Sequence, residues 1–367
     1  MKTLHFAPTL QPGSSTRLAA DLPYALQAYG GQSWVVSPEA EQLDYLLPPG
    51  IERPAFRPPA LLGRWGRVRR LRQLLEDIKP DILHAYGSEG ILTAARACRH
   101  LPRRSRPRLV GTLTGHPATP AFLHSPELQS CACLTIISKH LRRELKKHNP
   151  ALIKSWVIPY GVDEALCYPG YQPTAEWQHT WDTEHPELAG RFVLCLPGPI
   201  SPQHGTEDTL PILTTLLRQD VPAHCLIAGD TSRAPAAYLS RLRRSIRSAG
   251  LDRRITFIGA RPDLRDILTR AHAVLHLAAA PAAYDRPALE ALALGRPVVG
   301  YAHGIIGEYL ETFNPVGAVP PGNTAAAADV LSQWHSSPPD ALPGIPYPYR
   351  LADTAKTYHD LYTSLLS

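Results

Sequence analysis

Short runs of apolar residues, each about the length of a β-strand, recur along the chain and alternate with segments long enough for helices. In the first half the runs lie at 3–7, 33–37, 81–85, 109–113, 133–137 and 155–159. In the second half they lie at 191–196, 224–228, 255–258, 273–277 and 297–301. Their hydrophobicity is unbroken rather than alternating, which is typical of parallel strands buried on both faces. Helix-like stretches between them, such as 237–249 and 286–294, complete βα units. The pattern predicts an α/β protein with two doubly wound sheets.

The length of the chain, 367 residues, also predicts two domains, because a single hydrophobic core rarely grows beyond about 250–300 residues. We expect a first domain over 1–165 and a second over 191–348. Residues 166–190 are polar and aromatic without clear periodicity and are expected to form a linker. The amphipathic end, 349–367, predicts a final helix. Ligands of doubly wound sheets bind at the carboxyl ends of the strands, so two such domains would place a site in the cleft between them.

The segment GPISPQHGTEDTL, residues 198–210, directly follows one of the apolar runs. A buried strand is expected to enter a tight Gly/Pro loop there, and a helix to begin near Thr206. Loops of this kind often bind phosphate groups through their backbone amides. This one contains no Lys or Arg, and His204 is its only basic side chain. A second strand-to-helix loop, residues 11–16, offers Gly13 and Ser14 as part of a plausible anion cradle.

The positive charge of the chain belongs to its first half. Residues 1–170 contain 22 Lys and Arg against 13 Asp and Glu, whereas the remainder contains 16 against 19. The basic residues gather in 63–75, 101–109 and 138–147. Such clusters suit a phosphate-rich partner, either nucleic acid or an anionic membrane surface, although each could also be a solvated helix face. No recognition helix or RNA-stacking motif accompanies the charge, which disfavours nucleic acid.

Several classes of protein are not indicated by the sequence. No run of about 20 apolar residues could span a bilayer, and the first residues, MKTLHFAP, lack the apolar stretch of a signal peptide. The expected location is therefore cytoplasmic. The six cysteines are scattered without the spacing of a zinc site, and they are interpreted as small buried apolar residues.

The order of the motifs resembles that of a known family. VIPYGVDEALCYP (157–169), LIAGDTS (226–232), ITFIGARPDLRDIL (255–268), HAVLHLAAA (272–280) and RPALEALALGRPVVGYAHGIIGEYL (286–310) are similar to successive elements of the retaining glycosyltransferases of family 4. PDILHAYG (80–87) and LTIISKHLRREL (134–145) resemble elements of that family's first domain. The resemblance implies the GT-B fold. In that fold two Rossmann-like domains face each other across a cleft, the second holds most of the sugar nucleotide, and a C-terminal helix crosses back to the first.

The resemblance also implies donor-binding residues. Glu290 would bind the ribose hydroxyls of the nucleotide, while Gly304 and Glu308 belong to a turn whose amides approach the donor phosphate. Gly205 closes the loop after the strand at 191–196, and Gly13 with Ser14 would contact acceptor and donor. A structural reading stays open for these positions, because a carboxylate at a helix start is stabilised by the helix dipole and a glycine may only permit a turn.

Four polar positions of the family pattern are absent together. The loop Arg and Lys that neutralise the donor diphosphate fall at Pro199 and His204, and the first Glu of the family's pair falls at Ala282. The Asn of the NGvD element is Tyr160. The first-domain His has moved or been replaced, and His116 is the nearest histidine to its position.

Three cations are candidates to replace the missing ones. A neighbouring phosphate would favour the charged form of His204. Arg286 precedes Glu290 by one helical turn, so both could face one site. Arg261 follows the strand at 255–258. Removing one oxyanion donor typically costs about 2.7–4 kcal/mol of transition-state stabilisation, so loss of both cations without replacement would leave little turnover.

The sequence therefore predicts a retaining glycosyltransferase of cell-surface polysaccharide synthesis that needs no metal or other cofactor. It would move a sugar from a nucleotide diphosphate donor to a lipid-linked or saccharide acceptor, with His116 and His204 as the candidate catalytic residues. The basic stretch after residue 63 would lie at the inner face of the membrane through Arg64, Arg67, Arg69, Arg70 and Arg72. The alternative is an inactive pseudo-glycosyltransferase that acts as a binding or scaffold subunit.

Overall fold

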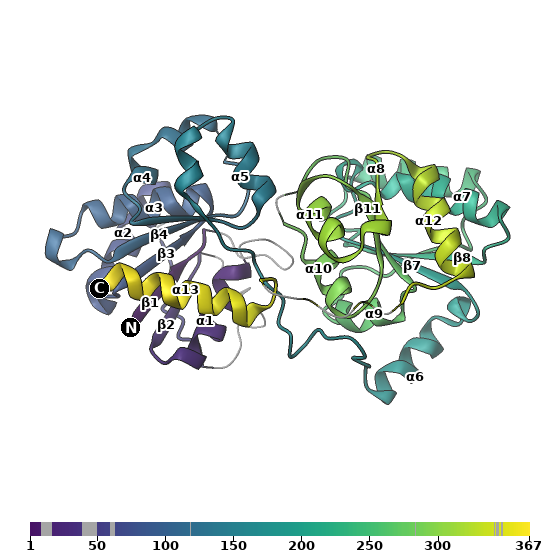
Figure 1. Cartoon of the computed structure of the whole chain (residues 1–367), viewed down its shortest axis with the longest axis horizontal. Coiled ribbons are helices and arrows are strands. Elements are labelled where there is room, and N and C mark those ends of the chain that lie inside the picture. Colours follow the sequence, from purple (N-terminus) through teal and green to yellow (C-terminus); the bar gives the residue numbers. More distant parts are fainter. Residues whose placement is uncertain are drawn as a thin grey trace. The chain divides into compact units, whose positions relative to one another are not determined.

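The computed structural model divides the chain into two compact units (Figure 1). Unit 1 comprises Met1–Asp163 and Pro346–Ser367, and unit 2 comprises Glu164–Ile345. The structure describes residues 1–8, 17–38, 50–58, 63–117, 119–282, 284–340, 342, 345 and 348–367.

Unit 1 is built on a parallel sheet with the strand order β2-β1-β3-β4-β5-β6. In the described residues these strands are β1 (Lys2–Phe6), β2 (Gln32–Val36), β3 (Ile82–Tyr86), β4 (Arg108–Leu113), β5 (Cys133–Ile136) and β6 (Trp156–Val157). Strand β1 is paired on both sides, with β2 and with β3, so it forms the centre from which the sheet winds in two directions. The apolar runs at the six expected positions thus become parallel strands, as predicted.

Helices cover both faces of this sheet. They are α1 (Leu18–Leu26), α2 (Gly63–Ile78), α3 (Gly87–Arg99), α4 (Pro126–Gln129), α5 (Lys139–Lys146) and α13 (Leu351–Leu366). Helices α2, α3 and α4 form a contiguous layer, whereas α1 packs against α13. The C-terminal helix therefore lies beside the first helix of the chain, more than 320 residues away in sequence (Figure 1).

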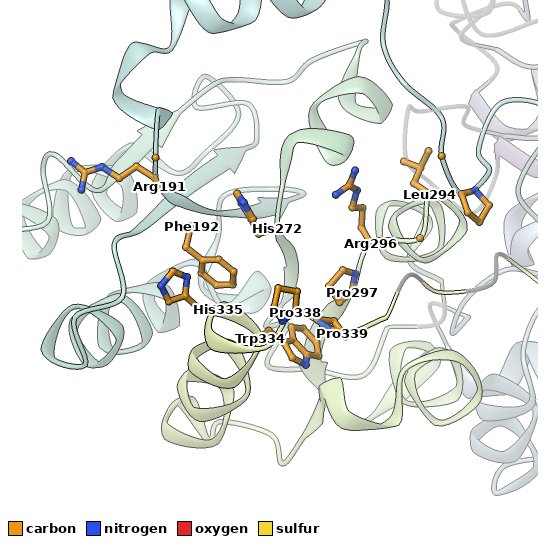
Figure 2. Close-up of a pocket in the computed structure, with 14 residues that line it drawn as sticks. Arg191, Phe192, His272, Leu294, Arg296, Pro297, Trp334, His335, Pro338 and Pro339 are labelled. Atoms are coloured by element: carbon orange, nitrogen blue, oxygen red, sulfur yellow. The ribbon is translucent and has the colours of Figure 1, made fainter.

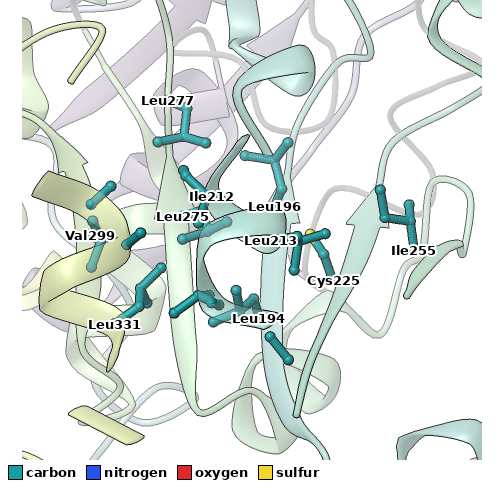
Figure 3. Close-up of a cluster of buried hydrophobic side chains, with 14 of the residues drawn as sticks. Leu194, Leu196, Ile212, Leu213, Cys225, Ile255, Leu275, Leu277, Val299 and Leu331 are labelled. Atoms are coloured by element: carbon teal, nitrogen blue, oxygen red, sulfur yellow. The ribbon is translucent and has the colours of Figure 1, made fainter. Parts of the chain in front are cut away.

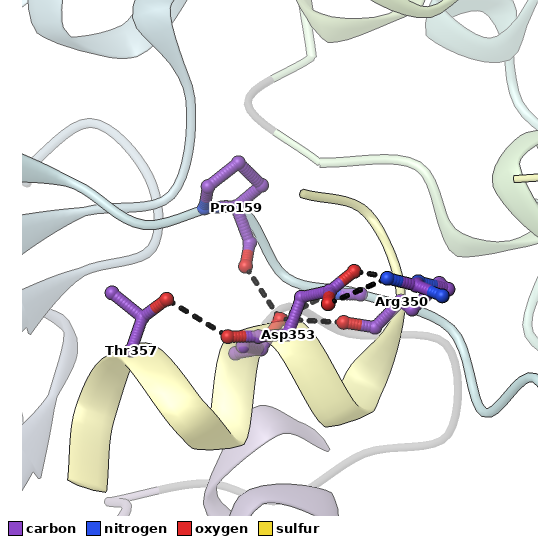
Figure 4. A network of polar contacts seen from close by, with 6 residues as sticks. Pro159, Arg350, Asp353 and Thr357 are labelled. Atoms are coloured by element: carbon purple, nitrogen blue, oxygen red, sulfur yellow. Dashed lines mark hydrogen bonds and ion pairs between the residues drawn. The ribbon is translucent and has the colours of Figure 1, made fainter. Parts of the chain in front are cut away.

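The backbone at Gly161 anchors the start of α13. The amide of Val162 donates to Tyr349 O (2.9 Å), and that of Leu351 donates to Val162 O (2.8 Å). A Cβ atom at Gly161 would lie 2.2 Å from the carbonyl carbon of Arg350, so only glycine permits the two segments to approach this closely. Thr354 Oγ1 adds a further link, accepting from Gly161 N (3.0 Å) and donating to Pro159 O (2.9 Å). Figure 4 shows Pro159 beside the start of this helix, where Arg350 Nε donates to Asp353 (2.7 Å).

A buried polar network joins α13 to the sheet beneath it. His84 of β3 pairs through Nδ1 with the hydroxyl of Tyr362 (2.5 Å) and through Nε2 with Thr112 Oγ1 (2.5 Å). The hydroxyl of Tyr358 contacts both Thr112 Oγ1 (3.1 Å) and Thr135 Oγ1 (2.9 Å). The helix is thus tied by side chains to β3, β4 and β5, where it could otherwise have formed only an apolar contact.

A second histidine extends the same network. His5 Nδ1 lies 2.7 Å from the hydroxyl of Tyr86, which also lies 3.0 Å from His84 Nδ1. Both imidazoles are completely buried. Burial lowers the pKa of His5 to about 3, and burial together with repulsion from His5 lowers the pKa of His84 well below 6.5. Both rings are therefore neutral at physiological pH.

Unit 2 repeats the doubly wound design with the strand order β12-β11-β10-β7-β8-β9. In the described residues the strands are β7 (Phe192–Pro197), β8 (Ala223–Ala228), β9 (Ile255–Phe257), β10 (Ala273–His276), β11 (Val298–Tyr301) and β12 (Ala318–Val319). All described pairings are parallel. The short edge strand β12 was not expected from the sequence, because two residues are too few to form a recognisable apolar run.

The helices of unit 2 form two layers. They are α6 (Ala175–Glu184), α7 (Thr209–Arg218), α8 (Ala236–Ser248), α9 (Leu264–Arg270), α10 (Arg286–Ala293), α11 (Gly304–Phe313) and α12 (Thr324–Ser336). Helix α12 packs on α7, whereas α10 contacts both α9 and α11. Leu194, Leu275 and Val299 from three strands pack with Ile212 of α7 and Leu331 of α12 in the main core (Figure 3). Cys195 and Cys225 are fully buried and unpaired, and burial raises the pKa of Cys195 to about 12, in keeping with an apolar role.

The segment 166–190, expected to be a linker, belongs to unit 2 and contains α6. Trp177 Nε1 donates to Asp263 Oδ2 (2.8 Å), and its ring stacks on Trp181 with centroids 5.2 Å apart. Asp182 accepts from Arg270 Nη2 (2.6 Å). The linker assignment is corrected accordingly: these contacts fix the segment to unit 2.

No described helix is both long enough and apolar enough to cross a bilayer.

Acid is expected to weaken unit 1 through its two buried histidines. Because the folded pKa values are lowered below the ordinary 6.5, the unfolded chain takes up protons that the folded chain does not. Their contribution is complete above pH 6.5 and falls as the pH decreases, by about 1.4 kcal/mol per pH unit for each histidine. Calorimetric unfolding between pH 6.5 and 5, above the carboxylate range, should show this slope.

His5→Gln should make that slope shallower, whereas His148→Gln, which changes an exposed histidine of the same unit, should leave it as in the unmodified chain. An equal slope in all three proteins would contradict the account of the network.

Candidate functional site

In unit 2 the winding of the sheet reverses between β7 and β10. The chain moves outward from β7 to β8 and β9, then returns to β10 and continues to β11 and β12. In an open α/β sheet, ligands bind outside the carboxyl ends of the strands at such a reversal. The loops that begin at residues 198, 277 and 302 leave β7, β10 and β11 at this edge, and they form the candidate site.

Gly205 fixes the first of these loops against the second. It has a left-handed backbone (φ 69°, ψ 25°) and ends the short turn Pro202–His204. A Cβ atom at this position would lie 1.8 Å from the carbonyl oxygen of Leu277. The amide of Ala279 donates to Gln203 O (2.9 Å) across the same junction. Gly205 is therefore required both for its conformation and for the absence of a side chain.

Gly304 makes the equivalent junction between the loops after β10 and β11. Its φ is 62°, and a Cβ atom would lie 2.7 Å from both the N and O atoms of Ala282. The amide of Ile305 donates to Ala282 O (2.9 Å), and His303 Nε2 lies 2.9 Å from Ala278 O. Ala282 is the position at which the first Glu of the family pattern is absent. Here its backbone holds the start of α11 in place.

Three titratable side chains, His204, His276 and Asp285, gather beside these loops. Of these, only His204 was a candidate in the sequence. His276 Nδ1 lies 2.9 Å from Asp285 Oδ2. Asp285 also caps α10, since its Oδ1 accepts from Ala288 N (2.8 Å). Burial opposes ionisation of Asp285, but the contacts with His276 and the Ala288 amide outweigh it and lower its pKa. Asp285 precedes Arg286-Pro287, an order typical of a helix N-cap, so this capping role could have been found in the sequence.

His204 lies within the electrostatic influence of this pair, and its Nδ1 is 2.8 Å from Ser201 Oγ. Partial burial lowers the pKa of His204; Asp285 acts in the opposite direction and His276 reinforces the decrease. The imidazole is therefore mainly neutral at pH 7 in the structure as it stands. Without a bound anion it does not supply the charge of the family's missing Lys.

Arg286 and Glu290 face each other across one turn of α10, as their spacing predicts. Arg286 Nε donates to Glu290 Oε1 at 2.6 Å, and the side chains are only 21% and 13% exposed. The pair is close to neutral as a unit, so Arg286 is not an independent replacement for a diphosphate-binding cation. Glu308 is half-buried on α11, within two turns of the junction at Gly304.

Arg261 is not brought together with this group. It follows the edge strand β9, which is separated from β7 by β8. Its Nε and Nη2 donate to Asp263 at 2.8 and 2.7 Å, and its guanidinium lies over the Trp181 ring at 5.8 Å. Arg261 therefore joins the network that holds α6.

The remaining candidates belong to unit 1 or lie outside the described residues. His116 is exposed three residues beyond the end of β4. Tyr160, which stands at the family's Asn position, is buried and donates to Asp21 of α1. Gly13 and Ser14 lie outside the described residues.

The candidate arginines of α2 differ in their contacts. Arg67 pairs with Glu89 (2.8 Å), Arg72 pairs with Glu76 (2.9 Å), and Arg70 Nη2 donates to Ala55 O (2.6 Å). Arg64 and Arg69 are exposed. Trp65, which the sequence analysis did not single out, is 67% exposed on the same helix.

No group of three or more His, Cys, Asp or Glu residues in the described part of the chain is arranged to hold a metal ion. The site instead combines tightly joined backbone loops, a helix start at Gly304, the Arg286–Glu290 ion pair, Asp285 and three histidines, His204, His276 and His303. Such an edge can accept an anion through amides and the positive end of a helix, and a hydroxyl-bearing group through a carboxylate.

Two Rossmann-like units, each with a parallel sheet, define the GT-B architecture, and solved glycosyltransferases share it. The glycosyltransferase from Rickettsia africae ESF-5 superposes with a TM-score of 0.81 at 16% identity, covering 100% of this chain and 99% of that one. HepE of Anabaena in complex with UDP superposes with a TM-score of 0.74 at 18% identity, covering 100% of this chain and 97% of that one. Its complex with UDP-glucose superposes with a TM-score of 0.75 at 17% identity, covering 99% and 100%.

The chain belongs to the group 1 and family 4 glycosyltransferases. The family "Glycosyl transferases group 1" matches residues 178–347, and "Glycosyltransferase Family 4" matches residues 15–166. The lipopolysaccharide core biosynthesis mannosyltransferase LpcC of Rhizobium leguminosarum bv. viciae is 26% identical over 220 residues. That match covers 57% of this chain and 60% of LpcC, so the chain matches less than two thirds of this curated relative. The resemblance inferred from the motifs is confirmed for the family, and retention of configuration stays a prediction.

Gly205→Ala is expected to disrupt the junction of the first two loops, and Gly250→Ala provides a matched control. The two glycines have nearly the same φ, 69° and 68°, but a Cβ atom at Gly250 would meet nothing within 4 Å. Both variants bear the backbone strain of about 1–2 kcal/mol, while only Gly205→Ala adds a steric cost of about 1–3 kcal/mol. Denaturant unfolding of unit 2 should resolve the difference, and equal destabilisation would show that the junction is not rigid.

Proposed function

We propose that the chain transfers a sugar from a nucleotide diphosphate donor, with retention of anomeric configuration, to a lipid-linked or saccharide acceptor in cell-surface glycan synthesis. The observation that carries the proposal is the joined edge of unit 2, where Gly205 and Gly304 hold three loops together and the loop after β10 leads into α10, the helix that carries Glu290. LpcC, a relative by sequence, is a mannosyltransferase of lipopolysaccharide core synthesis, and HepE, a relative by fold, was solved with UDP and UDP-glucose. These relatives support the class of reaction and the class of donor.

In this proposal the nucleotide lies along the carboxyl edge of the sheet. Glu290 accepts hydrogen bonds from the ribose hydroxyls, and the start of α11 at Gly304 directs its positive end toward the diphosphate. Glu308, on the next turn of that helix, borders the sugar-phosphate region. No metal is assigned to the reaction, because helix ends and side chains would neutralise the diphosphate.

Departure of the nucleoside diphosphate is the step most affected by the missing cations. Negative charge develops on the leaving group, and preorganised donors are the main means of stabilising it. We assign this task to the α11 helix start and to His204. A phosphate next to His204 would raise the pKa of the imidazole and offset the burial that lowers it. Binding of the donor would thus favour protonation of His204, and the protonated imidazole would stabilise the departing nucleoside diphosphate.

His204→Ala should reduce kcat about 10²–10³-fold, the usual effect of removing one such donor. His204→Gln, which retains a hydrogen-bond donor without the charge, should recover part of the rate.

Since free His204 has a lowered pKa, kcat/KM of the unmodified enzyme should fall as the pH rises from acid toward neutral. His204→Gln should lose this dependence. Initial rates at several pH values provide the measurement, and an unchanged rate in His204→Ala would rule out the assigned role.

A folded chain that binds none of a panel of nucleotide sugars in calorimetric titration would support the alternative, an inactive binding or scaffold subunit. Binding without turnover over a range of acceptors would support it too. Binding together with turnover would exclude it.

We further propose that α2 of unit 1 holds the enzyme at an anionic membrane surface on the cytoplasmic side. Trp65 is exposed with Arg64, Arg69 and Arg72 on the same helix, a combination typical of interfacial segments. Arg57, Arg69 and Arg70 also line a hollow of about 380 Å³ beside this helix, a size that suits a phosphate-bearing headgroup.

Replacing Arg64, Arg69 and Arg72 together by Gln should weaken binding to anionic vesicles roughly 100-fold, since each arginine contributes about 1 kcal/mol. The matched control changes Arg244, Arg247 and Arg253 of unit 2, which are also exposed, and should leave binding intact. Co-sedimentation at fixed ionic strength measures the difference. Equal binding by both variants, or preferential retention of unrelated DNA over vesicles, would contradict the membrane assignment.

A further inference from the structure

Unit 2 contains a large hollow at the sheet edge opposite the candidate donor site. It has a volume of about 610 Å³ and opens beside the amino-terminal ends of β7, β10 and β11, at Phe192, His272 and Pro297 (Figure 2). We call it the basal cavity. The six-residue strand β7 separates it from the donor edge by roughly 17 Å. Its volume is in the range of small-molecule binding sites.

The basal cavity is lined by cationic side chains without an acidic one. Among the described residues that line it, Arg191, Arg296, His272 and His335 can carry positive charge, and none is Asp or Glu. An adjoining hollow of about 630 Å³ shares Arg191, His272 and Arg296 and adds Arg270, whose charge is already paired with Asp182. The charge of the basal cavity is therefore not balanced by its own walls.

Arg296 is the clearest case of this imbalance. Its Nε is buried and has no hydrogen-bond partner among the described residues. Burial, with repulsion from Arg270, lowers the pKa of this guanidinium. A buried donor without a partner costs about 1–3 kcal/mol, and more when it is charged, and in native proteins it often marks the place of an ion or water. A guanidinium edge matches the two oxygens of a carboxylate or phosphate.

The histidines that line the cavity are held around an aromatic ring. Phe192 lies between His272 and His335, with ring centroids 5.3 and 5.2 Å away, and Figure 2 shows the three side chains in a row. His272 Nδ1 accepts from Val193 N at 3.0 Å, so in the neutral ring Nε2 carries the proton and can donate. Trp334 and four prolines complete an apolar wall. The cavity thus offers oxyanion donors beside a surface for a ring.

We propose that the basal cavity binds a small organic oxyanion, a carboxylate or phosphate carried on a ring-sized apolar body, with Arg296 and His272 as its donors. The site is distinct from the donor edge and uses residues to which the transfer reaction assigns no role. Occupation would place an anion against the guanidinium of Arg296 and compensate its partly buried charge.

Calorimetric titration of the full chain with phenyl phosphate, benzoate, inorganic phosphate and benzyl alcohol tests this proposal. At least one of the two ring-bearing anions should bind, at least about tenfold more tightly than inorganic phosphate, which lacks the ring, and benzyl alcohol, which lacks the charge. The stronger of the two identifies phosphate or carboxylate as the preferred group. Absence of binding by both up to about 10 mM would overturn the proposal.

Arg296→Met should weaken that binding about 10- to 100-fold, the worth of a charge-assisted hydrogen bond. Arg247→Met, at an exposed arginine of α8, and Glu290→Gln, at the donor edge, should leave it unchanged. Because Arg296 Nε has no hydrogen-bond partner among the described residues, Arg296→Met should fold with a melting temperature equal to or above that of the unmodified chain. If Arg296→Met fails to fold, Arg296→Lys keeps the charge but loses the planar edge, and it should still weaken binding. Equal binding in the unmodified chain and a folded Arg296 variant, or equal loss in Glu290→Gln, would contradict the assignment.

Discussion

The close approach of three backbone loops at the carboxyl edge of the second sheet is the constraint on which the rest of the site depends. Gly205 lies against the carbonyl of Leu277, and Gly304 lies against the backbone of Ala282. Neither position has room for a side chain. The buried strands β7, β10 and β11 fix where these loops begin, so the apolar core of unit 2 determines the geometry of a polar edge.

The charges of unit 2 are distributed unevenly between the two edges of its sheet. At the donor edge Arg286 is paired with Glu290, and His204 is kept mainly neutral by burial. Arg261 is used to hold α6. By contrast, Arg296 and Arg191 line the opposite edge, where no acidic residue among the described lining balances them. In the proposed reaction the donor edge would rely on amides, a helix start and an induced charge, whereas the basal cavity has permanent cations.

Much of the fold could be predicted from the sequence because parallel strands buried on both faces leave unbroken apolar runs. Eleven such runs became strands within one or two residues of their expected ends, and the run at 155–159 is the most shortened, forming β6 (Trp156–Val157). The helix at Arg286 was equally clear, since its ion pair with Glu290 follows from helical spacing alone.

Contacts between distant segments could not be predicted in the same way. Nothing local in the sequence shows that His84 would meet Tyr362 across 278 positions, or that Trp177 would bind Asp263 and attach the supposed linker to unit 2. Arg261 was expected at the donor site because it follows a strand, but which strand lies at the edge depends on sheet order, which local patterns do not reveal.

A crystal structure of the chain with the nucleoside diphosphate that it binds most tightly tests the central claim most directly. The account predicts the diphosphate between the loop ending at Gly205 and the start of α11, with the ribose beside Glu290. Density for the ligand against Arg296 instead, or an empty donor edge in a saturated crystal, would contradict it.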